Sequence, residues 1–552
     1  MVQIPSESQV ESRGWLDRLE SRFRRYSSLI AAILLAFGFL WRLWLAHATF
    51  FNTDEAWHFF LANQDSAQQA YKASLTISHP PLLILVEYFW RALGTSNLVL
   101  RLPAVIAGAL SCWIFYRWLN LVAGAATAWA GLILSAFLAP MISTSAEVRQ
   151  NPLLLMFAVA AIYFFDRALS GGSALAMLAS AACLVFAMLS HYSAFFVAAA
   201  LGVYSILRMW TQPPAKPVIA AWIVGQTSGV TVAAFLYKTH LGRLGSVLKE
   251  ALPPQQYLAS SYFQAGSDHV VPFLYRGTIG VFRFVFGQTQ IGQFAVVLFA
   301  VGVVLLFLRR GPDRGRDRTL GILLMLPLVL NWFAVAAGAY PFGRMRQCMF
   351  LAIFFLAGIS VALAWIAHER SIISAVLALA IVLLCHAFGT LQDRDAFPLA
   401  EQRHEHMDAA IQFVRSEVLP GDVILTDKAT SYQLLHYLCH QKPAASDPPF
   451  EGLEVFRCDR FVVLSTGPFE GALSVPTILA RWIDARGFPN VTGDVWVVEG
   501  GWATGMGEQL RSSPALSQPA LAQIDVHSFG RYLEIIKMPP GKRTDVVAQP
   551  AR

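Results

Sequence analysis

The sequence predicts a polytopic α-helical membrane protein with a soluble α/β domain after its last membrane span. Of its 552 residues, 56% are hydrophobic and only 14% are charged. Soluble domains carry about 25% charged residues, so a single water-soluble globule is excluded, and a chain this apolar would not stay disordered. The long apolar runs stop near residue 390, where the composition changes to that of a soluble domain.

A helix that crosses a bilayer needs roughly 20 mostly apolar residues, and about eleven such runs are present. The fifth and sixth runs are short, which leaves the count open there. We expect the spans near Leu29–Ala48, Leu98–Leu119, Ala123–Ile142, Leu153–Leu169, Ala174–Leu189, Ala194–Leu207, Val218–Tyr237, Ile291–Leu308, Leu320–Ala339, Cys348–Ala367 and Ile372–Phe388.

Two arginine clusters orient these spans. Basic residues concentrate on the cytoplasmic side of membrane proteins, so residues 1–28 are expected to be a cytoplasmic segment. The first apolar run is too long for a typical signal peptide and is expected to stay as an anchor. Alternation then places the second cluster inside too, and the formal charge of +7 becomes a topology signal that does not indicate a nucleic-acid partner. The clusters are Arg13, Arg18, Arg22, Arg24 and Arg25, then Arg309, Arg310, Arg314, Arg316 and Arg318.

The same alternation assigns a multi-span region, residues 29–390, whose unusual polar residues fall on the external side. The internal loops are short and plain. Because the polar residues lie on the external side, we expect the protein to act at the outer leaflet of a plasma or inner membrane. The segments expected outside are Phe50–Asn97, Ser143–Asn151, Ser190–Ser193, Lys238–Gln290, Gly338–Arg346 and everything after Gly389.

Residues 391–552 are expected to form an external α/β domain, because carboxylates and turn residues replace the apolar runs. Its predicted helices are His406–Val418 and Thr430–His440, and its predicted strands are Asp422–Thr426, Arg460–Ser465, Asp494–Glu499 and Tyr532–Lys537.

Cysteine and histidine suggest little further chemistry in this domain. Cys439 and Cys458 lie where a disulfide can form and persist, although spacing alone does not bring their Cα atoms together. Several histidines, an aspartate and a cysteine of this domain could also suggest a metal site. A solvated helix and a disulfide cysteine explain these residues more simply. No cofactor is required by the sequence, and a divalent metal ion stays open. The residues concerned are His404, His406, Asp408, His436, Cys439 and His440.

The first external loop carries two adjacent carboxylates, Asp54 and Glu55. Carboxylates just beyond a membrane helix can act as a general base or a metal ligand for an incoming hydroxyl. The alternative is structural: Asn52, Thr53 or Asp54 caps a helix whose dipole favours Glu55. The two interpretations are compatible, because capping fixes one group while the other faces a cavity.

Further polar residues recur on the predicted external side. His79 precedes two prolines and is either a turn residue or a phosphate ligand. Glu147 and Arg149 lie at a membrane edge, where an interfacial ion pair competes with a substrate path. His191 is a polar interruption that most often marks a plain turn. Arg344 and Arg346 lie outside against the topology bias, which favours phosphate recognition; all six residues are candidates for substrate binding.

After the anchor span these motifs follow in a fixed order: Asp54-Glu55, His79-Pro80-Pro81-Leu82, Arg101-Leu102-Pro103, Glu147-x-Arg149, His191-Tyr192 and Tyr340-Pro341-x-x-Arg344. Their order and common side resemble the family 39-type membrane glycosyltransferases. These are GT-C-fold enzymes related to protein O-mannosyltransferases and aminoarabinose lipid A transferases. The resemblance covers roughly Leu29–Phe388, with a weaker match in the external domain.

The resemblance implies a GT-C-like membrane fold, a polyprenyl-phosphate-linked sugar donor and a lipid, glycan or protein acceptor in the cell envelope. Asp54 matches the family's first-loop base, and Glu55 would assist it or shape the site. His79 and Arg344 would lie near the donor phosphate or sugar. Many relatives have an aromatic residue after Glu-x-Arg, whereas Gln150-Asn151-Pro152 follows here, so the roles of Glu147 and Arg149 stay open.

Two other classes of protein compete with a glycosyltransferase. A transporter or flippase of lipid-linked sugars also needs many spans, but it predicts charges deep within helices and an inverted repeat. A cell-envelope assembly protein would use its tail to bind partners, and would tolerate Asp54→Asn. The identities of the sugar and of the acceptor do not follow from the chain.

Overall fold

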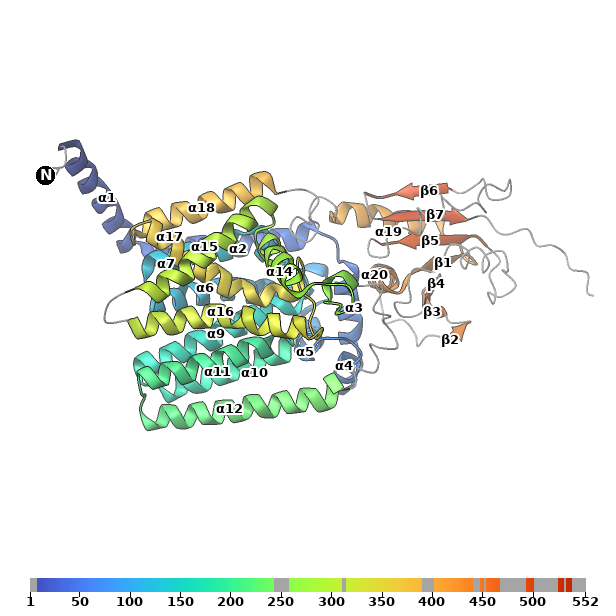
Figure 1. Ribbon diagram of the computed structural model, residues 1–552. Helices are drawn as coiled ribbons and strands as arrows, with labels where there is room; N and C mark the ends of the chain where they lie inside the picture. The colour runs from blue at the N-terminus through green and yellow to red at the C-terminus, as the bar shows by residue number, and fades with distance from the viewer. Residues whose placement is uncertain are drawn as a thin grey trace, which may run out of the picture. The chain divides into compact units, whose positions relative to one another are not determined.

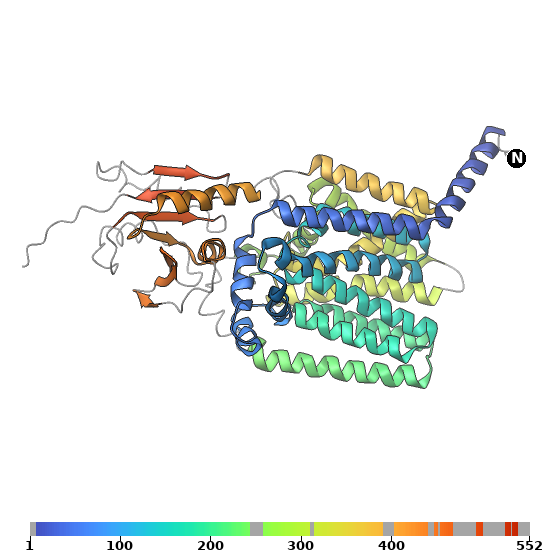
Figure 2. The same cartoon turned by 180° about the vertical axis from the view of Figure 1, so that it is seen from behind.

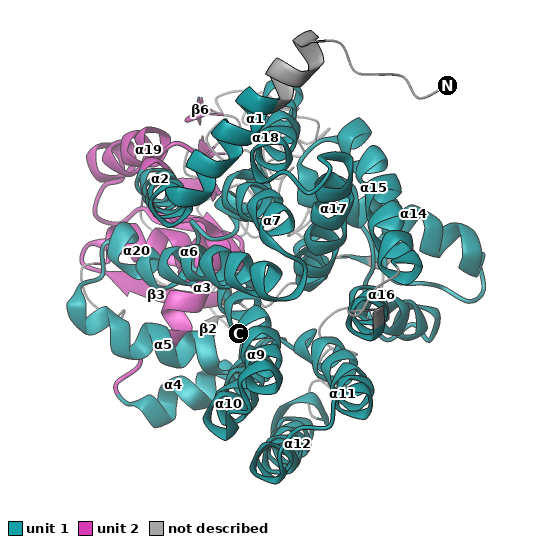
Figure 3. Ribbon diagram, turned by 90° about the vertical axis from the view of Figure 1, so that its left-hand side faces the viewer, with its two compact units in different colours: residues 1–47, 66–245, 258–398 teal, residues 48–65, 246–257, 399–552 magenta. Residues whose placement is uncertain are grey.

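The chain folds into two compact units (Figure 1; Figure 3). The membrane unit comprises residues 1–47, 66–245 and 258–398, and the C-terminal unit comprises residues 48–65, 246–257 and 399–552. The first loop, with Asp54 and Glu55, therefore groups with the C-terminal unit. The computed structural model describes residues 7–242, 258–309, 314–389, 402–439, 447–450, 453–466, 493–500, 525–530 and 533–538.

The membrane unit is a helical bundle whose long helices run side by side (Figure 1; Figure 2). Helix α2 exposes Leu29, Ile33 and Phe37 along one face, as suits contact with lipid. Its helices are α1 (Glu7–Arg25), α2 (Ser27–Ala48), α4 (Ala67–Ser74), α5 (Leu82–Trp90), α6 (Asn97–Val122), α7 (Ala125–Phe137), α8 (Ala139–Ser143), α9 (Gln150–Gly171), α10 (Ala174–Ser190), α11 (Ala194–Thr211), α12 (Lys216–Leu236), α14 (Val270–Phe286), α15 (Thr289–Leu308), α16 (Arg314–Ala336), α17 (Ala352–Ile366) and α18 (Ser371–Phe388), with short 3₁₀ or π turns η1 (Arg91–Leu93), η2 (Tyr237–Leu241), η3 (Ala259–Ser261) and η4 (Arg346–Leu351).

The predicted spans correspond to helices of this bundle. Within the described residues, nine helices are long and apolar enough to cross a membrane. The third and fifth predicted spans fall instead on two shorter apolar helices, Ala125–Phe137 and Ala174–Ser190. The polytopic α-helical fold class is therefore confirmed.

The third predicted span, Ala123–Ile142, is not one continuous helix. Leu138 has extended backbone angles, φ −63° and ψ 133°, and separates α7 from α8. Pro140 accounts for this break, because its ring would clash with the carbonyl group four residues earlier and it has no N–H to donate. Hydropathy registers the run of apolar side chains but not the interrupted backbone.

Helix α14 lies inside the segment Lys238–Gln290, which is expected on the external side, and α14 is not among the helices of the described residues that are long and apolar enough to cross a membrane. It packs against α15 and buries Phe273, Val281 and Phe282. Two arginines, Arg276 and Arg283, interrupt its apolar sequence. An amphipathic helix of this kind leaves no continuous apolar run for a hydropathy scan to detect.

Among its described residues, the C-terminal unit contains a mixed sheet of seven strands, which confirms the predicted α/β character. The strand order is β2-β3-β4-β1-β5-β7-β6, with β1 parallel to both β4 and β5 and the other pairs antiparallel. The elements are α3 (Thr53–Ala62), α19 (His404–Glu417), β1 (Val423–Thr426), α20 (Lys428–Leu438), β2 (Asp447–Phe450), β3 (Leu453–Cys458), β4 (Phe461–Thr466), β5 (Val495–Glu499), β6 (Asp525–Ser528) and β7 (Glu534–Met538).

Both helices and all four strands predicted for this region are present, and no end is shifted by more than two residues. The last residue of one predicted helix, His440, and the first of one predicted strand, Tyr532, lie outside the described residues. Strands β2, β3 and β6 were not predicted; β2 contains two prolines, which only an edge strand tolerates. Cys439 and Cys458 form a disulfide with their Cα atoms 5.0 Å apart.

Candidate functional site

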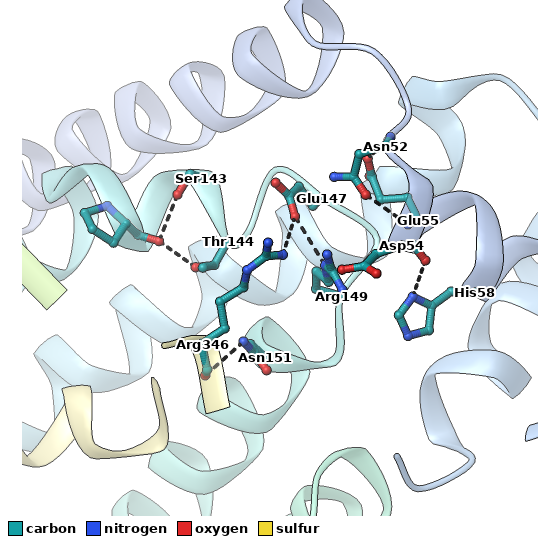
Figure 4. Close-up of polar contacts among 11 residues, drawn as sticks. Asn52, Asp54, Glu55, His58, Ser143, Thr144, Glu147, Arg149, Asn151 and Arg346 are labelled. Atoms are coloured by element: carbon teal, nitrogen blue, oxygen red, sulfur yellow. Dashed lines mark hydrogen bonds and ion pairs between the residues drawn. The ribbon is translucent and has the colours of Figure 1, made fainter. Parts of the chain in front are cut away.

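The two first-loop carboxylates have different environments. Asn52 caps α3: its side-chain oxygen accepts a hydrogen bond from the Glu55 N–H at 3.0 Å, and Glu55 Oε2 accepts one from the Asn52 N–H at 2.9 Å (Figure 4). Glu55 is completely buried, whereas Asp54 is half-buried. This reciprocal capping box assigns Glu55 to the start of the helix, so Asp54 is the carboxylate better suited to meet a substrate.

In the membrane unit, three candidate residues meet in one cluster. Glu147 Oε2 accepts hydrogen bonds from Arg149 Nε and from Arg346 Nη1, each at 3.3 Å (Figure 4). Asn151 Nδ2 donates to the Arg346 carbonyl oxygen at 3.4 Å. The cluster lies at the N-terminal end of α9, whose dipole adds to its positive charge. Two guanidinium groups on one carboxylate leave a net positive charge that suits an anion.

The loop from Tyr340 to Arg346 is held against α14 by two glycines. A Cβ atom on Gly277 would lie 2.2 Å from the Phe342 ring, and one on Gly280 would lie 3.0 Å from the Arg344 backbone nitrogen. The Phe342 N–H also donates to the Ser261 carbonyl oxygen at 2.8 Å. The backbone that carries the predicted arginines is therefore fixed, while the Arg344 side chain is exposed.

His79 and His191 are also brought together, with ring centroids 5.4 Å apart. His191 Nδ1 lies 2.8 Å from Ser193 Oγ and accepts a hydrogen bond from the Ser193 N–H at 3.1 Å. Burial raises the pKa of Tyr340 well above its ordinary value, and a hydrogen bond with Ser193 opposes that rise. The Tyr340 hydroxyl donates to the Gln347 carbonyl oxygen at 2.8 Å. Polar contacts thus continue from His79 to the segment that carries Arg346.

Burial lowers the pKa of His191 from 6.5 to about 4. Between these values an unfolded chain binds a proton that the folded chain excludes, so His191 destabilises the fold as the pH falls from about 7 towards 4. We expect the loss attributable to His191 to reach about 3 kcal/mol near pH 4. His191→Asn, which keeps an acceptor for the Ser193 N–H, should flatten this part of the stability profile measured by denaturant unfolding in micelles. An unchanged slope would contradict the prediction.

Arg42 contacts Ser145, two residues before Glu147. We did not predict a role for Arg42 from the sequence. Its side chain is 1% exposed, and Nε donates to Ser145 Oγ at 2.8 Å. Its Nη atoms donate to the carbonyl oxygens of Ala136 at 2.9 Å and Ser135 at 3.2 Å. The break after α7 leaves these two carbonyls without helical partners, so Arg42 caps the broken helix. The sequence did contain a signal for this role, because a charged residue inside a predicted membrane span needs polar partners there.

We expect Arg42→Met to lower the free energy of unfolding by roughly 2–6 kcal/mol, because two buried carbonyls each lose a bond worth roughly 1–3 kcal/mol. Unfolding in mixed detergent micelles measures this change. Arg117→Met is the matched control: Arg117 is exposed, lies 5.7 Å from the Trp113 ring centroid, and should cost about 1 kcal/mol or less. Equal effects of the two substitutions would contradict the capping role of Arg42.

Two of the histidines weighed as metal ligands, His404 and His436, have other contacts. His404 Nδ1 lies 3.2 Å from the Ala48 carbonyl oxygen, and the His436 ring stacks on Phe51 at a centroid distance of 4.4 Å. Across the part of the chain that the structure describes, no group of three or more His, Cys, Asp or Glu residues could hold a metal ion. His440 lies outside that part.

The chain resembles known proteins in part of its sequence and in its fold. Residues 78–237 match the family of dolichyl-phosphate-mannose-protein mannosyltransferases. The crystal structure of ArnT from Cupriavidus metallidurans in the apo state superposes with a TM-score of 0.50 at 12% identity, covering 93% of this chain and 98% of ArnT. The chain has a GT-C-type glycosyltransferase fold.

The crystal structure of ArnT from Cupriavidus metallidurans bound to undecaprenyl phosphate gives a TM-score of 0.50 at 13% identity, with the same coverage of both chains. No curated protein matches the sequence. The GT-C-type fold and the family resemblance implied by the motifs are thereby confirmed, and the protein is an integral membrane protein. The family match spans His79, Glu147, Arg149 and His191.

Proposed function

We propose that the protein transfers a sugar from a polyprenyl-phosphate-linked donor to a cell-envelope acceptor at the outer face of the membrane. The observation that carries the proposal is the mostly buried, net positive cluster of Glu147, Arg149 and Arg346. A lipid phosphate is an anion of the size that two guanidinium groups recognise. ArnT from Cupriavidus metallidurans, which shares the fold, binds undecaprenyl phosphate.

In the proposed reaction, the bond between the anomeric carbon and the phosphate oxygen breaks as the acceptor oxygen attacks that carbon. Asp54 takes the proton of the acceptor hydroxyl as general base. Arg149 and Arg346 stabilise the charge that develops on the departing phosphate, with Glu147 holding both guanidinium groups in place. The products are the glycosylated acceptor and polyprenyl phosphate. Asp54 releases the acceptor proton to the phosphate product or to water, so atoms and charge balance without a further reactant.

The remaining candidate residues have supporting roles. Glu55 closes the capping box and thereby holds the start of α3, next to Asp54. His79 and His191 interact with the donor sugar or phosphate, and His191 does so as a neutral ring because its pKa is about 4. Arg344, on the exposed face of its loop, makes a further contact with phosphate.

The proposed orientation places the N-terminus in the cytoplasm and the C-terminal unit outside, in a plasma or inner membrane. The arginines before α2 support it, since basic residues stay inside. The disulfide between Cys439 and Cys458 supports it independently, because such bonds persist in oxidising compartments.

The test is transfer by the purified full-length protein in liposomes, supplied with a set of polyprenyl-phosphate sugars and envelope acceptors. We expect release of polyprenyl phosphate together with a glycosylated acceptor, both followed by mass spectrometry. A lipid-linked sugar transporter would instead move a fluorescent donor between leaflets without consuming it. Flipping without consumption of any donor would therefore overturn the proposal.

A further inference from the structure

The residue that precedes the α3 cap is held at both of its backbone groups by one helix. The Phe51 N–H donates to the Tyr437 hydroxyl at 2.7 Å, and Gln433 Nε2 donates to the Phe51 carbonyl oxygen at 2.9 Å. Gln433 and Tyr437 are four residues apart and so share one face of α20. The point at which the chain enters α3 is therefore fixed by two side chains of α20.

Aromatic contacts extend this attachment along α3. The Phe51 ring stacks on His436, with centroids 4.4 Å apart. Further along, Trp57 lies parallel to Tyr432 at 6.3 Å, and Phe60 contacts the same ring at 4.7 Å. Helix α3 has only 10 residues, and an isolated helix of that length is marginal in water. Its order depends on packing of this kind.

Helix α20 is itself attached to the sheet at both ends. At its start, Asp427 follows β1 and caps the helix, and Thr430 Oγ1 accepts a hydrogen bond from the Gly500 N–H, just after β5, at 3.1 Å. At its end, the disulfide joins Cys439 to Cys458 of β3. A helix held in this way does not shift independently of its sheet.

We propose that α20 is the positioning element for Asp54, and that Gln433 and Tyr437 act on sugar transfer by fixing the start of α3. The inference rests on the proposed function, because it gives the C-terminal domain a part in catalysis through the base. Every contact in this path, from the sheet through α20 to Phe51 and the Asn52 cap, lies within the C-terminal unit. Asp54 therefore moves with that domain.

Three variants of the full-length protein test the proposal. Tyr437→Phe removes only the hydroxyl that holds the Phe51 N–H, and Gln433→Met removes the amide that holds its carbonyl group. Ser431→Ala is the matched control on the same helix, because the Ser431 hydroxyl donates to the Lys428 carbonyl oxygen within α20 itself. Each is assayed for kcat and for donor KM, and each is compared with its Asp54→Asn double variant.

We expect Tyr437→Phe and Gln433→Met each to lower kcat about tenfold or more, since small displacements of a catalytic group are costly. Donor KM should stay within about twofold, and Ser431→Ala should change neither constant. In the Asp54→Asn background, Tyr437→Phe should have no further effect, because it acts only through the base. An equal loss of kcat in both backgrounds would overturn the proposal.

Hydrogen exchange of residues 52–62 provides a readout that does not depend on activity. We expect faster exchange across α3 in Tyr437→Phe and in Gln433→Met, but not in Ser431→Ala. Unchanged exchange would refute the positioning role whatever the activity. Selectively faster exchange in a protein that transfers no sugar would refute the proposed function and leave the positioning of α3 standing.

Discussion

Asp54→Asn is expected to lower kcat for sugar transfer by about 10³-fold, whereas Glu55→Gln is expected to lower it by about tenfold or less. A positioned general base contributes about 10²–10⁴-fold, and asparagine cannot take the acceptor proton. Glutamine, in contrast, can still accept the Asn52 N–H bond that Glu55 makes at 2.9 Å, because the capping box works with either residue. The measurement is single-turnover transfer at saturating donor.

The pair of variants separates chemistry from folding. Both should retain the melting temperature of the parent protein within a few degrees, and both should bind polyprenyl phosphate with unchanged affinity. Full transfer by both Asp54→Asn and Glu55→Gln would remove the proposed carboxylate base from the mechanism. A larger loss in Glu55→Gln than in Asp54→Asn would exchange the two roles.

Replacing both Arg149 and Arg346 with glutamine is expected to lower kcat/KM for the donor by about 10³-fold. Each guanidinium group donates to Glu147 at 3.3 Å, and losing both leaves a buried carboxylate where an anionic donor must bind. Removal of one preorganised donor at a developing charge typically costs about 10²–10³-fold. Binding of polyprenyl phosphate in nanodiscs, measured together with transfer, separates donor affinity from catalysis.

Two controls sharpen the arginine experiment. Arg346→Lys keeps the charge but loses the planar fork, so it should recover only part of the activity. Arg309→Gln removes an arginine paired with Glu369 and should leave donor affinity unchanged. If the Arg149 and Arg346 variants bound the donor as well as Arg309→Gln does, the cluster would have no part in phosphate recognition.

Local patterns made much of this fold predictable. A cap at the start of α3 was foreseen with Asn52, Thr53 or Asp54 as candidates, because capping depends only on neighbouring positions. The structure assigns it to Asn52, in a capping box with Glu55. Hydropathy likewise found the long spans, since lipid contact demands long apolar runs. It failed at Leu138, where the backbone breaks within an apolar run.

Contacts between distant residues were the part that spacing did not reveal. Glu147 and Arg149 are neighbours in sequence, but Arg346 reaches the same carboxylate from 199 residues away. The alternation of the predicted spans placed these residues on one side of the membrane, but it did not indicate which of them are in contact. The grouping of α3 with the C-terminal unit depends on α20, which lies more than 360 residues further along the chain, and no local signal identifies such a partner.

The capping of α7 by Arg42 has a consequence for biosynthesis. The ribosome delivers α2 first, and the carbonyl groups of Ser135 and Ala136 follow only 93 and 94 residues later. An arginine at the centre of a lone inserted helix costs about 2.5–3.5 kcal/mol, and Arg42 lies between the centre of α2 and its C-terminal end. The nascent first span therefore stays incompletely satisfied until α7 and α8 have been synthesised. The stable insertion of α2 is therefore coupled to the insertion of α7 and α8, although α2 is synthesised before them.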